Sequence, residues 1–264
     1  MSVCDGYAPG TPNWVDLQST DLAAAKGFYG RLFGWPYAER PSGDGGYWVA
    51  ALDGAPVAAI MARTPPMRAA ALPATWSTYI ATPDVDAAAA RAAAAGGELR
   101  AGPFGLPGAG RMAVVGDPAG AVVSLWQADG HAGAGRVNEP GALTWNELVS
   151  DDLDAALPFY EATLGTRARR ERLDGDEYVV LLAGERIVAG ATARPGGPAG
   201  NHWHVWFGAD DVDALAQAAL AAGGSVLAPP ADSDAGTVAT LADPQGGVFS
   251  VIAALEPADA GAER

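Results

Sequence analysis

The sequence predicts an α+β protein built from four βαβββ modules, and three observations support this prediction. A pattern of Asp-Leu, then Phe-Tyr and a closing Gly, begins at Asp21 and recurs from Asp152, 131 residues later. Each half of the chain also contains a weaker copy of the pattern, starting at Asp84 and at Asp211. An alternating strand precedes each of these aspartates, and an alanine-rich helix and short β-type runs follow it.

Local signals predict where each helix begins and ends. The four aspartates lie where an N-cap side chain would accept the free amides of the first helical turn. Gly34 and Gly165 follow the first helix of each half, and the glycine pairs 96–97 and 223–224 follow the second. Glycine at such positions ends a helix. The runs after each helix are separated by Gly, Pro and Asp, which predicts hairpins.

The length of 264 residues is sufficient for two domains with a core each. We predict a first domain over residues 1–129 and a second over residues 141–256. Residues 130–140, rich in Gly and Ala without periodicity, are the expected linker. Residues 257–264 are expected to form a flexible tail.

Composition excludes several classes of protein. A formal net charge of −15 argues against nucleic-acid binding, because little would neutralise phosphates. The single cysteine, Cys4, excludes an internal disulfide framework and a cysteine-based zinc site. No apolar run is long enough to predict a membrane span, and the first residues lack a secretion signal. We therefore expect a cytoplasmic protein, either a monomer or a homodimer.

The ordered motifs resemble the vicinal oxygen chelate superfamily, which includes glyoxalase I, bleomycin-resistance proteins and extradiol dioxygenases. The resemblance rests on the Asp-Leu, Phe-Tyr and Gly motif followed by Asp-Val-Asp-Ala and Asp-Pro-x-Gly, in both halves. It runs from about Thr11 to Ala253. It implies two cup-shaped, half-barrel domains of glyoxalase type, each a curled sheet made by two modules with the helices outside.

The resemblance also implies where metal ligands would lie. They are expected seven residues before each capping aspartate and seven residues after the aspartate of each Asp-Pro-x-Gly motif. Those positions hold Trp14, Ser77, Trp145, His204, Ser124 and Ser250. Neither an indole nor a serine hydroxyl replaces a histidine or carboxylate ligand, so only His204 is a candidate. We therefore expect no metal, no other cofactor, and none of the glyoxalase or dioxygenase chemistry that needs the ion.

Strand alternation predicts which side chains line the two cups. The first cup is expected to hold Trp14, Asp16, Tyr79 and Trp126, and the second Trp145, Glu147, His204 and Trp206. Trp76 and Trp203 fall on the opposite faces and are expected to be packing residues. His131 lies in the linker and is given no role.

Each candidate has a structural and a functional interpretation. Asp16 and Glu147 are either buried carboxylates held by hydrogen bonds, or groups that orient a ligand or act as a base with a raised pKa. His204 is either a packed core histidine or the acid–base partner of Glu147. The tryptophans are either core residues or the walls of a ligand site.

The leading hypothesis is a metal-free small-molecule binding protein of the bleomycin-resistance type. Trp14, Asp16, Tyr79, Trp126, Trp145 and Trp206 would bind an aromatic or cationic specialised metabolite. The alternative is a metal-independent isomerase, cyclase, lyase or hydrolase in which Glu147 and His204 are catalytic. A third hypothesis is a dimerising structural protein with vestigial cups.

Overall fold

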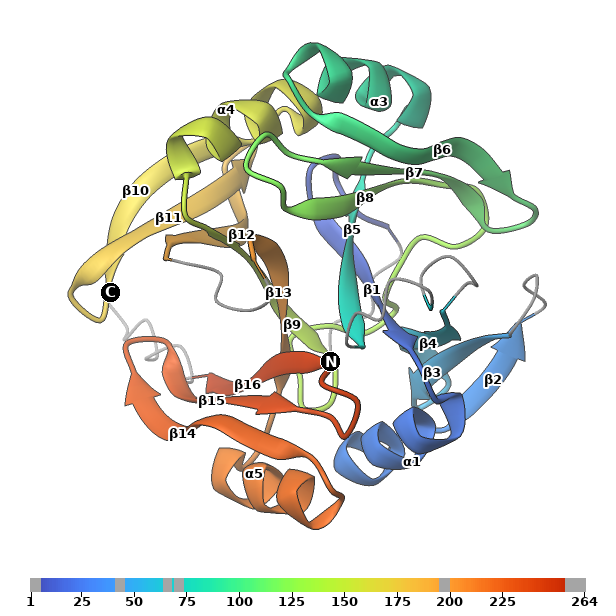
Figure 1. Cartoon of the computed structure of the whole chain (residues 1–264), viewed down its shortest axis with the longest axis vertical. Helices are drawn as coiled ribbons and strands as arrows, with labels where there is room; N and C mark the ends of the chain where they lie inside the picture. Colours follow the sequence, from blue (N-terminus) through green and yellow to red (C-terminus); the bar gives the residue numbers. More distant parts are fainter. Residues whose placement is uncertain (1–5, 41–45, 64–67, 69–73, 195–199, 255–264) are drawn as a thin grey trace, which may run out of the picture.

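The computed structural model describes residues 6–40, 46–63, 68, 74–194 and 200–254. The predicted tail, 257–264, lies outside these residues. In the described part of the chain the strands form two eight-stranded sheets, which curl around separate centres (Figure 1).

The first sheet has the strand order β2-β3-β4-β1-β5-β8-β7-β6. Its elements are β1 (Pro12–Ser19), α1 (Leu22–Phe33), β2 (Tyr37–Arg40), β3 (Tyr47–Leu52), β4 (Ala55–Ala62), β5 (Thr75–Ala81), α3 (Val85–Ala94), β6 (Glu98–Leu106), β7 (Gly110–Gly116) and β8 (Val122–Ala128). Strands β1 and β5 pair antiparallel at its centre, whereas β1–β4 and β5–β8 are parallel pairs.

The second sheet repeats this topology in the order β10-β11-β12-β9-β13-β16-β15-β14. Its elements are β9 (Leu143–Ser150), α4 (Leu153–Leu164), β10 (Arg167–Leu173), β11 (Asp176–Ala183), β12 (Arg186–Ala193), β13 (His202–Gly208), α5 (Val212–Ala221), β14 (Ser225–Ser233), β15 (Gly236–Ala242) and β16 (Val248–Ala254). The predicted α+β class and its four βαβββ modules are therefore confirmed over the described residues.

The predicted helix boundaries are also confirmed. Each capping aspartate accepts a hydrogen bond from the backbone amide three residues later, as Asp21 does from Ala24. Gly34 and Gly165 end α1 and α4 in the left-handed conformation, with φ of 71° and 73°. A side chain is disfavoured in this conformation, which is why glycine ends these two helices.

The two domains pack on each other through their helices. Helix α1 lies beside α5, and α3 lies beside α4 (Figure 1). The Tyr29 hydroxyl donates to Asp243 of the other domain at 3.1 Å, and Tyr160 donates to Asp117 at 2.9 Å. The helix-facing core of each domain is thus completed by the other domain.

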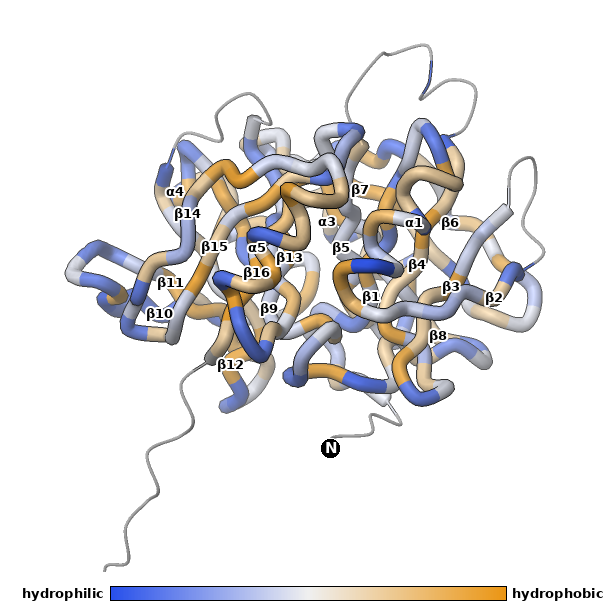
Figure 2. Tube along the Cα trace, turned by 90° about the horizontal axis from the view of Figure 1, so that it is seen from below, coloured by the Kyte–Doolittle hydropathy of each residue, from blue (hydrophilic) through white to orange (hydrophobic). Residues whose placement is uncertain are grey.

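Hydropathy along the chain agrees with this packing. Hydrophobic residues follow the strands of the interior, while hydrophilic residues gather at outer turns such as the one between β10 and β11 (Figure 2). Among the described residues, no helix is long and apolar enough to cross a membrane.

Candidate functional site

The concave face of the first sheet, here called cup 1, is centred on Asp16 of β1. This residue is 0% exposed, and its Oδ2 accepts hydrogen bonds from the Tyr79 hydroxyl at 2.6 Å and the Tyr47 hydroxyl at 3.4 Å. The Tyr47 oxygen in turn accepts from Trp14 Nε1 at 2.7 Å. Burial raises the pKa of Asp16 from 3.8 to about 6, against the lowering effect of the phenol hydrogen bonds.

The linker after β8 closes one side of cup 1. The His131 ring packs edge-on against Trp14, with centroids 4.5 Å apart, and lies 5.9 Å from the Trp126 ring. Its carbonyl accepts from Trp126 Nε1 at 2.9 Å, and the next residue, Ala132, accepts from Asn13 Nδ2 at 2.8 Å. Trp14 and Trp126 are consequently buried.

The matching face of the second sheet, cup 2, is centred on Glu147 of β9. This residue is 5% exposed, and its Oε2 lies 3.5 Å from Arg194 Nη2. Burial raises the pKa of Glu147, while the charge of Arg194 opposes that rise. Trp145 donates from Nε1 to the Tyr178 hydroxyl at 3.0 Å.

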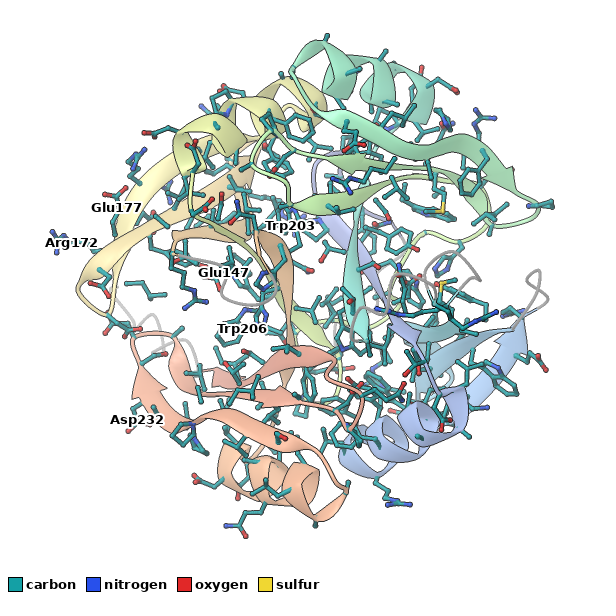
Figure 3. All side chains as sticks on the ribbon, viewed as in Figure 1. Glu147, Arg172, Glu177, Trp203, Trp206 and Asp232 are labelled. Atoms are coloured by element: carbon teal, nitrogen blue, oxygen red, sulfur yellow. The ribbon has the colours of Figure 1, made fainter. Side chains whose placement is uncertain are left out.

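The tryptophans of cup 2 are more open than those of cup 1, whereas Tyr47 of cup 1 and Tyr178 of cup 2 are both half-buried. Trp145 and Trp206 are paired residues of the neighbouring strands β9 and β13, and both are half-buried, as is Tyr178. Glu147 and Trp206 lie together on the side of the sheet enclosed by β10–β12 and β14–β16 (Figure 3). Cup 2 therefore offers partly exposed indole surface beside a buried carboxylate.

His204 lies directly across from Glu147, because the two are register partners on β13 and β9. No hydrogen bond joins these two side chains in the described structure. Instead His204 Nε2 lies 2.7 Å from the Ser250 hydroxyl, which contacts Thr240. Burial, with the charges of neighbouring His202 and Arg194, lowers the pKa of His204 from 6.5 to about 3. Its imidazole is therefore neutral at physiological pH.

Strand β12 brings a glycine, Gly190, opposite Glu147. A Cβ there would lie 1.8 Å from the Tyr178 hydroxyl oxygen and 2.9 Å from Trp145 Nε1. In cup 1 the corresponding partner of Asp16 is Ala59. The missing side chain thus lets Tyr178 lie across the cup floor.

The structure places all eight predicted site residues on the cup faces, in the two predicted groups. It also puts Trp76 and Trp203 on the opposite faces, in the helix-facing cores, as predicted. Whether the eight bind or transform a ligand is a proposal.

Sequence reasoning missed several cup residues. Tyr47 and Tyr178 are 131 residues apart, and so are Arg63 and Arg194, which is the offset of the main repeat. That offset could have identified both pairs. His131 was assigned no role, yet it packs against two tryptophans of cup 1; nothing in a Gly/Ala-rich linker indicated this.

The residues present do not fit a divalent metal ion of the family type. Among the described residues, no group of three or more His, Cys, Asp or Glu side chains could hold one. Cup 1 offers the carboxylate of Asp16, which is bound to phenols. Cup 2 offers Glu147 and His204, and the latter's Nε2 is engaged by Ser250.

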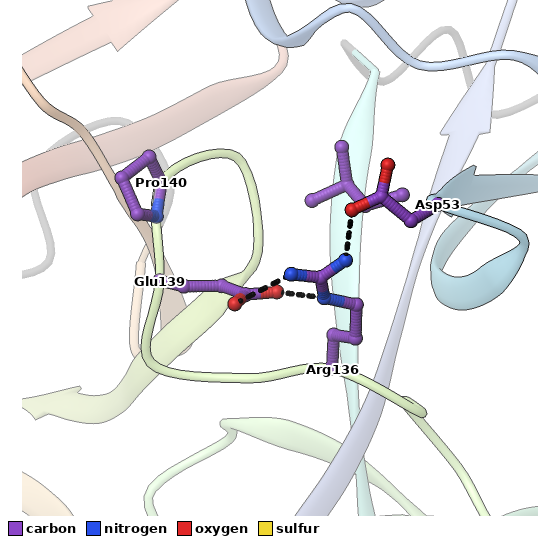
Figure 4. A pocket seen from close by; sticks show the side chains of 5 residues that line it. Asp53, Arg136, Glu139 and Pro140 are labelled. Atoms are coloured by element: carbon purple, nitrogen blue, oxygen red, sulfur yellow. Dashed lines mark hydrogen bonds and ion pairs between the residues drawn. The ribbon is translucent and has the colours of Figure 1, made fainter. Parts of the chain in front are cut away.

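Two surface grooves lie away from the cups. One, of about 160 Å³, is lined by Asp53, Arg136 and Glu139, where the arginine pairs with both acids and ties the linker to the β3–β4 turn (Figure 4). The other, of about 440 Å³, runs between α1 and α5 and is lined mainly by small and apolar residues. Neither contains a predicted site residue.

Two family models match the chain. The model described as Glyoxalase/Bleomycin resistance protein/Dioxygenase superfamily matches residues 11–125, and a glyoxalase-like domain model matches residues 147–252.

Relatives of nearly the same length also match. The chain is 50% identical over 250 residues to "Putative glyoxylase CFP32" of Mycobacterium tuberculosis, covering 93% of this chain and 95% of that protein. It is 42% identical over 270 residues to "Anthracycline biosynthesis protein DnrV" of Streptomyces peucetius, covering 97% and 98%.

Solved structures share the fold. The Mn(II)-bound glyoxalase from Novosphingobium aromaticivorans superposes with a TM-score of 0.65 at 19% identity, covering 94% of this chain and 83% of that one. The 2,3-dioxygenase LapB from Pseudomonas sp. KL28 also gives 0.65, at 14% identity and 95% coverage of both chains. The chain belongs to the glyoxalase/bleomycin resistance protein/dioxygenase superfamily, in a tandem two-domain form.

Proposed function

We propose that the protein is a metal-independent small-molecule binding protein whose ligand site is cup 2. The observation that carries the proposal is the pair of half-exposed indoles, Trp145 and Trp206, beside the buried carboxylate of Glu147. Their cup 1 counterparts, Trp14 and Tyr79, are buried. Cup 2 thus has indole surface available to a ligand, whereas the indoles of cup 1 are covered.

The expected ligand is a planar aromatic compound. Aromatic rings pack on indoles with a gain of about 0.5–1.5 kcal/mol beyond simple area burial. Glu147 would accept a hydrogen bond from a hydroxyl or N–H group of the ligand. The 42% identical relative is named for anthracycline biosynthesis, and anthracyclines contain planar fused rings, which supports this class of ligand. Cytoplasmic location and a monomeric or dimeric state stay predictions.

The test is a fluorescence titration with 2-(hydroxymethyl)anthraquinone, a planar quinone that quenches nearby tryptophans. We expect saturable quenching with one site per chain. Trp206→Leu should weaken binding about 5-fold, which corresponds to about 1 kcal/mol of lost ring contact.

Trp48→Leu is the matched control. Trp48 is also half-buried, but its ring lies beneath Lys26 of α1, outside both cups. The control should bind the probe as the wild type does. Unsaturable quenching, or equal loss in both variants, would contradict the proposal.

A second candidate function is a metal-independent enzyme. The register pairing of His204 with Glu147 favours it, because two titratable groups face one another across adjacent strands. The pKa of His204, about 3, makes its imidazole a poor base and leaves no imidazolium to act as an acid near neutral pH. In this enzyme Glu147 would carry the proton, and the neutral His204 would lie beside Glu147 on the neighbouring strand.

Solvent deuterium exchange tests the enzyme directly. If Glu147 acts as a base, the protein should accelerate incorporation of deuterium into the methyl group of 2-acetylnaphthalene, followed by NMR. Glu147→Gln should abolish the acceleration while probe binding persists. No acceleration by the wild type would remove this candidate and leave the binding proposal intact.

A further inference from the structure

Two arginines occupy equivalent places at the ends of β4 and β12. The backbone amide of Arg63 donates to Ser19 at 3.0 Å, and that of Arg194 donates to Ser150 at 3.0 Å. The two residues are 131 positions apart, the offset of the repeat. Their main chains are thus held identically against the central strand of each cup.

Their side chains differ. Arg63 is 3% exposed, and its guanidinium reaches the Gln18 carbonyl at 3.4 Å and the Thr75 hydroxyl at 3.5 Å. The side chain of Arg194 is 57% exposed, and the one hydrogen bond or ion pair that it makes within the described residues is with Glu147, at 3.5 Å. Close charge-assisted bonds are about 2.7–2.9 Å long, so this pair is loose.

The partners of the two carboxylates differ as well. Asp16 is held by the hydroxyl of Tyr79, whereas the residue at that place in cup 2 is Trp206, which has no hydroxyl. Glu147, one methylene longer, faces Arg194. The side chains of Trp206 and Tyr178 also lie close enough to Glu147 to lower its pKa, against the larger effect of burial.

The charge balance at cup 2 is therefore close to even. Glu147 is the acid and Arg194 the permanent cation. The pKa values of His202 and His204 are both lowered by burial, so both rings are neutral near pH 7, and Tyr178, whose pKa is raised, stays protonated. The overall charge of −15 disfavours anions at long range, but physiological salt screens it beyond about 8 Å. The guanidinium of Arg194 therefore determines which ligand charge is favoured in cup 2.

We infer that cup 2 recognises an aromatic carboxylate, with the ligand's carboxylate bound by the outward-facing N–H groups of Arg194 and its ring on Trp145 and Trp206. A planar guanidinium matches the two oxygens of a carboxylate. This inference rests on the proposed function and names the ligand class of that same site.

The ligand's charge also has a consequence for Glu147. Two carboxylates in one site cannot both ionise cheaply. Glu147 takes up a proton as the ligand binds, and its new O–H donates to the ligand. Binding is therefore accompanied by proton uptake.

The experiment compares three anthraquinones that carry a carboxylate, a hydroxymethyl or an aminomethyl group at carbon 2. We expect the carboxylate to bind about 10-fold more tightly than the hydroxymethyl compound, and the cationic amine most weakly. Arg194→Gln should weaken the carboxylate about 10-fold and change the hydroxymethyl compound less than about 2-fold. Calorimetry in two buffers of different ionisation enthalpy should show proton uptake with the carboxylate alone.

Arg172→Gln is the matched control. Arg172 is an exposed arginine of β10 that donates to the Gly175 carbonyl, at the outer margin of the same sheet (Figure 3). Its loss should leave all three affinities unchanged.

The outcomes separate this inference from the proposed function. Saturable binding of the hydroxymethyl compound without a carboxylate preference, or a preference unaffected by Arg194→Gln, overturns the inference alone. Tightest binding by the amine also overturns it. Failure of all three compounds to bind contradicts both the inference and the proposed function.

Discussion

Cup 1 and cup 2 share one arrangement, a carboxylate two residues after a tryptophan on the central strand. The side chains that surround this carboxylate differ between the two cups. In cup 1 two phenols meet the carboxylate of Asp16, and the linker packs His131 over the tryptophans. In cup 2 Glu147 faces a loose arginine, and the indoles keep exposed surface. Within one chain, a repeated module can thus bury its tryptophans in one copy while the other copy keeps partly exposed indoles beside a buried carboxylate.

The largest expected effect concerns the pH dependence of stability in cup 1. The pKa of Asp16 is about 6 in the folded protein against an ordinary 3.8, so the folded state holds this proton more tightly. The free energy of unfolding should therefore fall as the pH rises from about 4 through about 6. The loss from this group is about 3 kcal/mol.

Chemical denaturation from pH 4 to 7.5 measures this loss. Glu147 and other buried acids titrate in the same direction, so the informative quantity is the difference between the wild type and Asp16→Asn. That difference should change across this range and be constant above about pH 7. A difference independent of pH would show that Asp16 is not buried in a dry cup.

The second prediction concerns a substitution that gives cup 2 the alanine found at the equivalent position of cup 1. Gly190→Ala places a methyl group 1.8 Å from the Tyr178 hydroxyl oxygen. The Tyr178 ring must therefore move, and its hydrogen bond from Trp145 Nε1 is lost. The affinity for 2-(hydroxymethyl)anthraquinone should fall by about 10-fold or more.

The reciprocal change, Ala59→Gly, is the control for this substitution. It should leave the affinity unchanged and lower the free energy of unfolding by about 1 kcal/mol, because glycine weakens a strand. Equal effects of the two substitutions on binding would mean that both cups hold ligand.

The smallest expected effect comes from His131→Ala. Losing its edge contacts with Trp14 and Trp126 should cost about 1 kcal/mol of unfolding free energy. The number of bound probe molecules per chain, from calorimetric titration, should stay at one. A second equivalent would reveal cup 1 as a ligand site that the linker blocks.

Much of the fold could be predicted from the sequence because its signals are local. The capping aspartates and closing glycines act on their own helices, and strand alternation assigned Trp76 and Trp203 to the opposite face from Trp14 and Trp145. The repeat offset then related the two halves. The same offset relates Tyr178 to Tyr47 and Arg194 to Arg63. Identical residues at equivalent positions do not, however, reveal that these side chains lie beside a carboxylate.

The sequence by itself determined the modules, the faces of their strands and the cup residues on the central strands, since a strand's period of two needs no partner. Only the tertiary structure decided that Tyr29 and Tyr160 bind acids of the opposite domain and that His131 covers cup 1. Only the tertiary structure, likewise, exposes Arg194 while it buries Arg63. These contacts join residues far apart in the chain, and their outcome depends on which neighbours supply hydroxyl groups, volume and charge at each site.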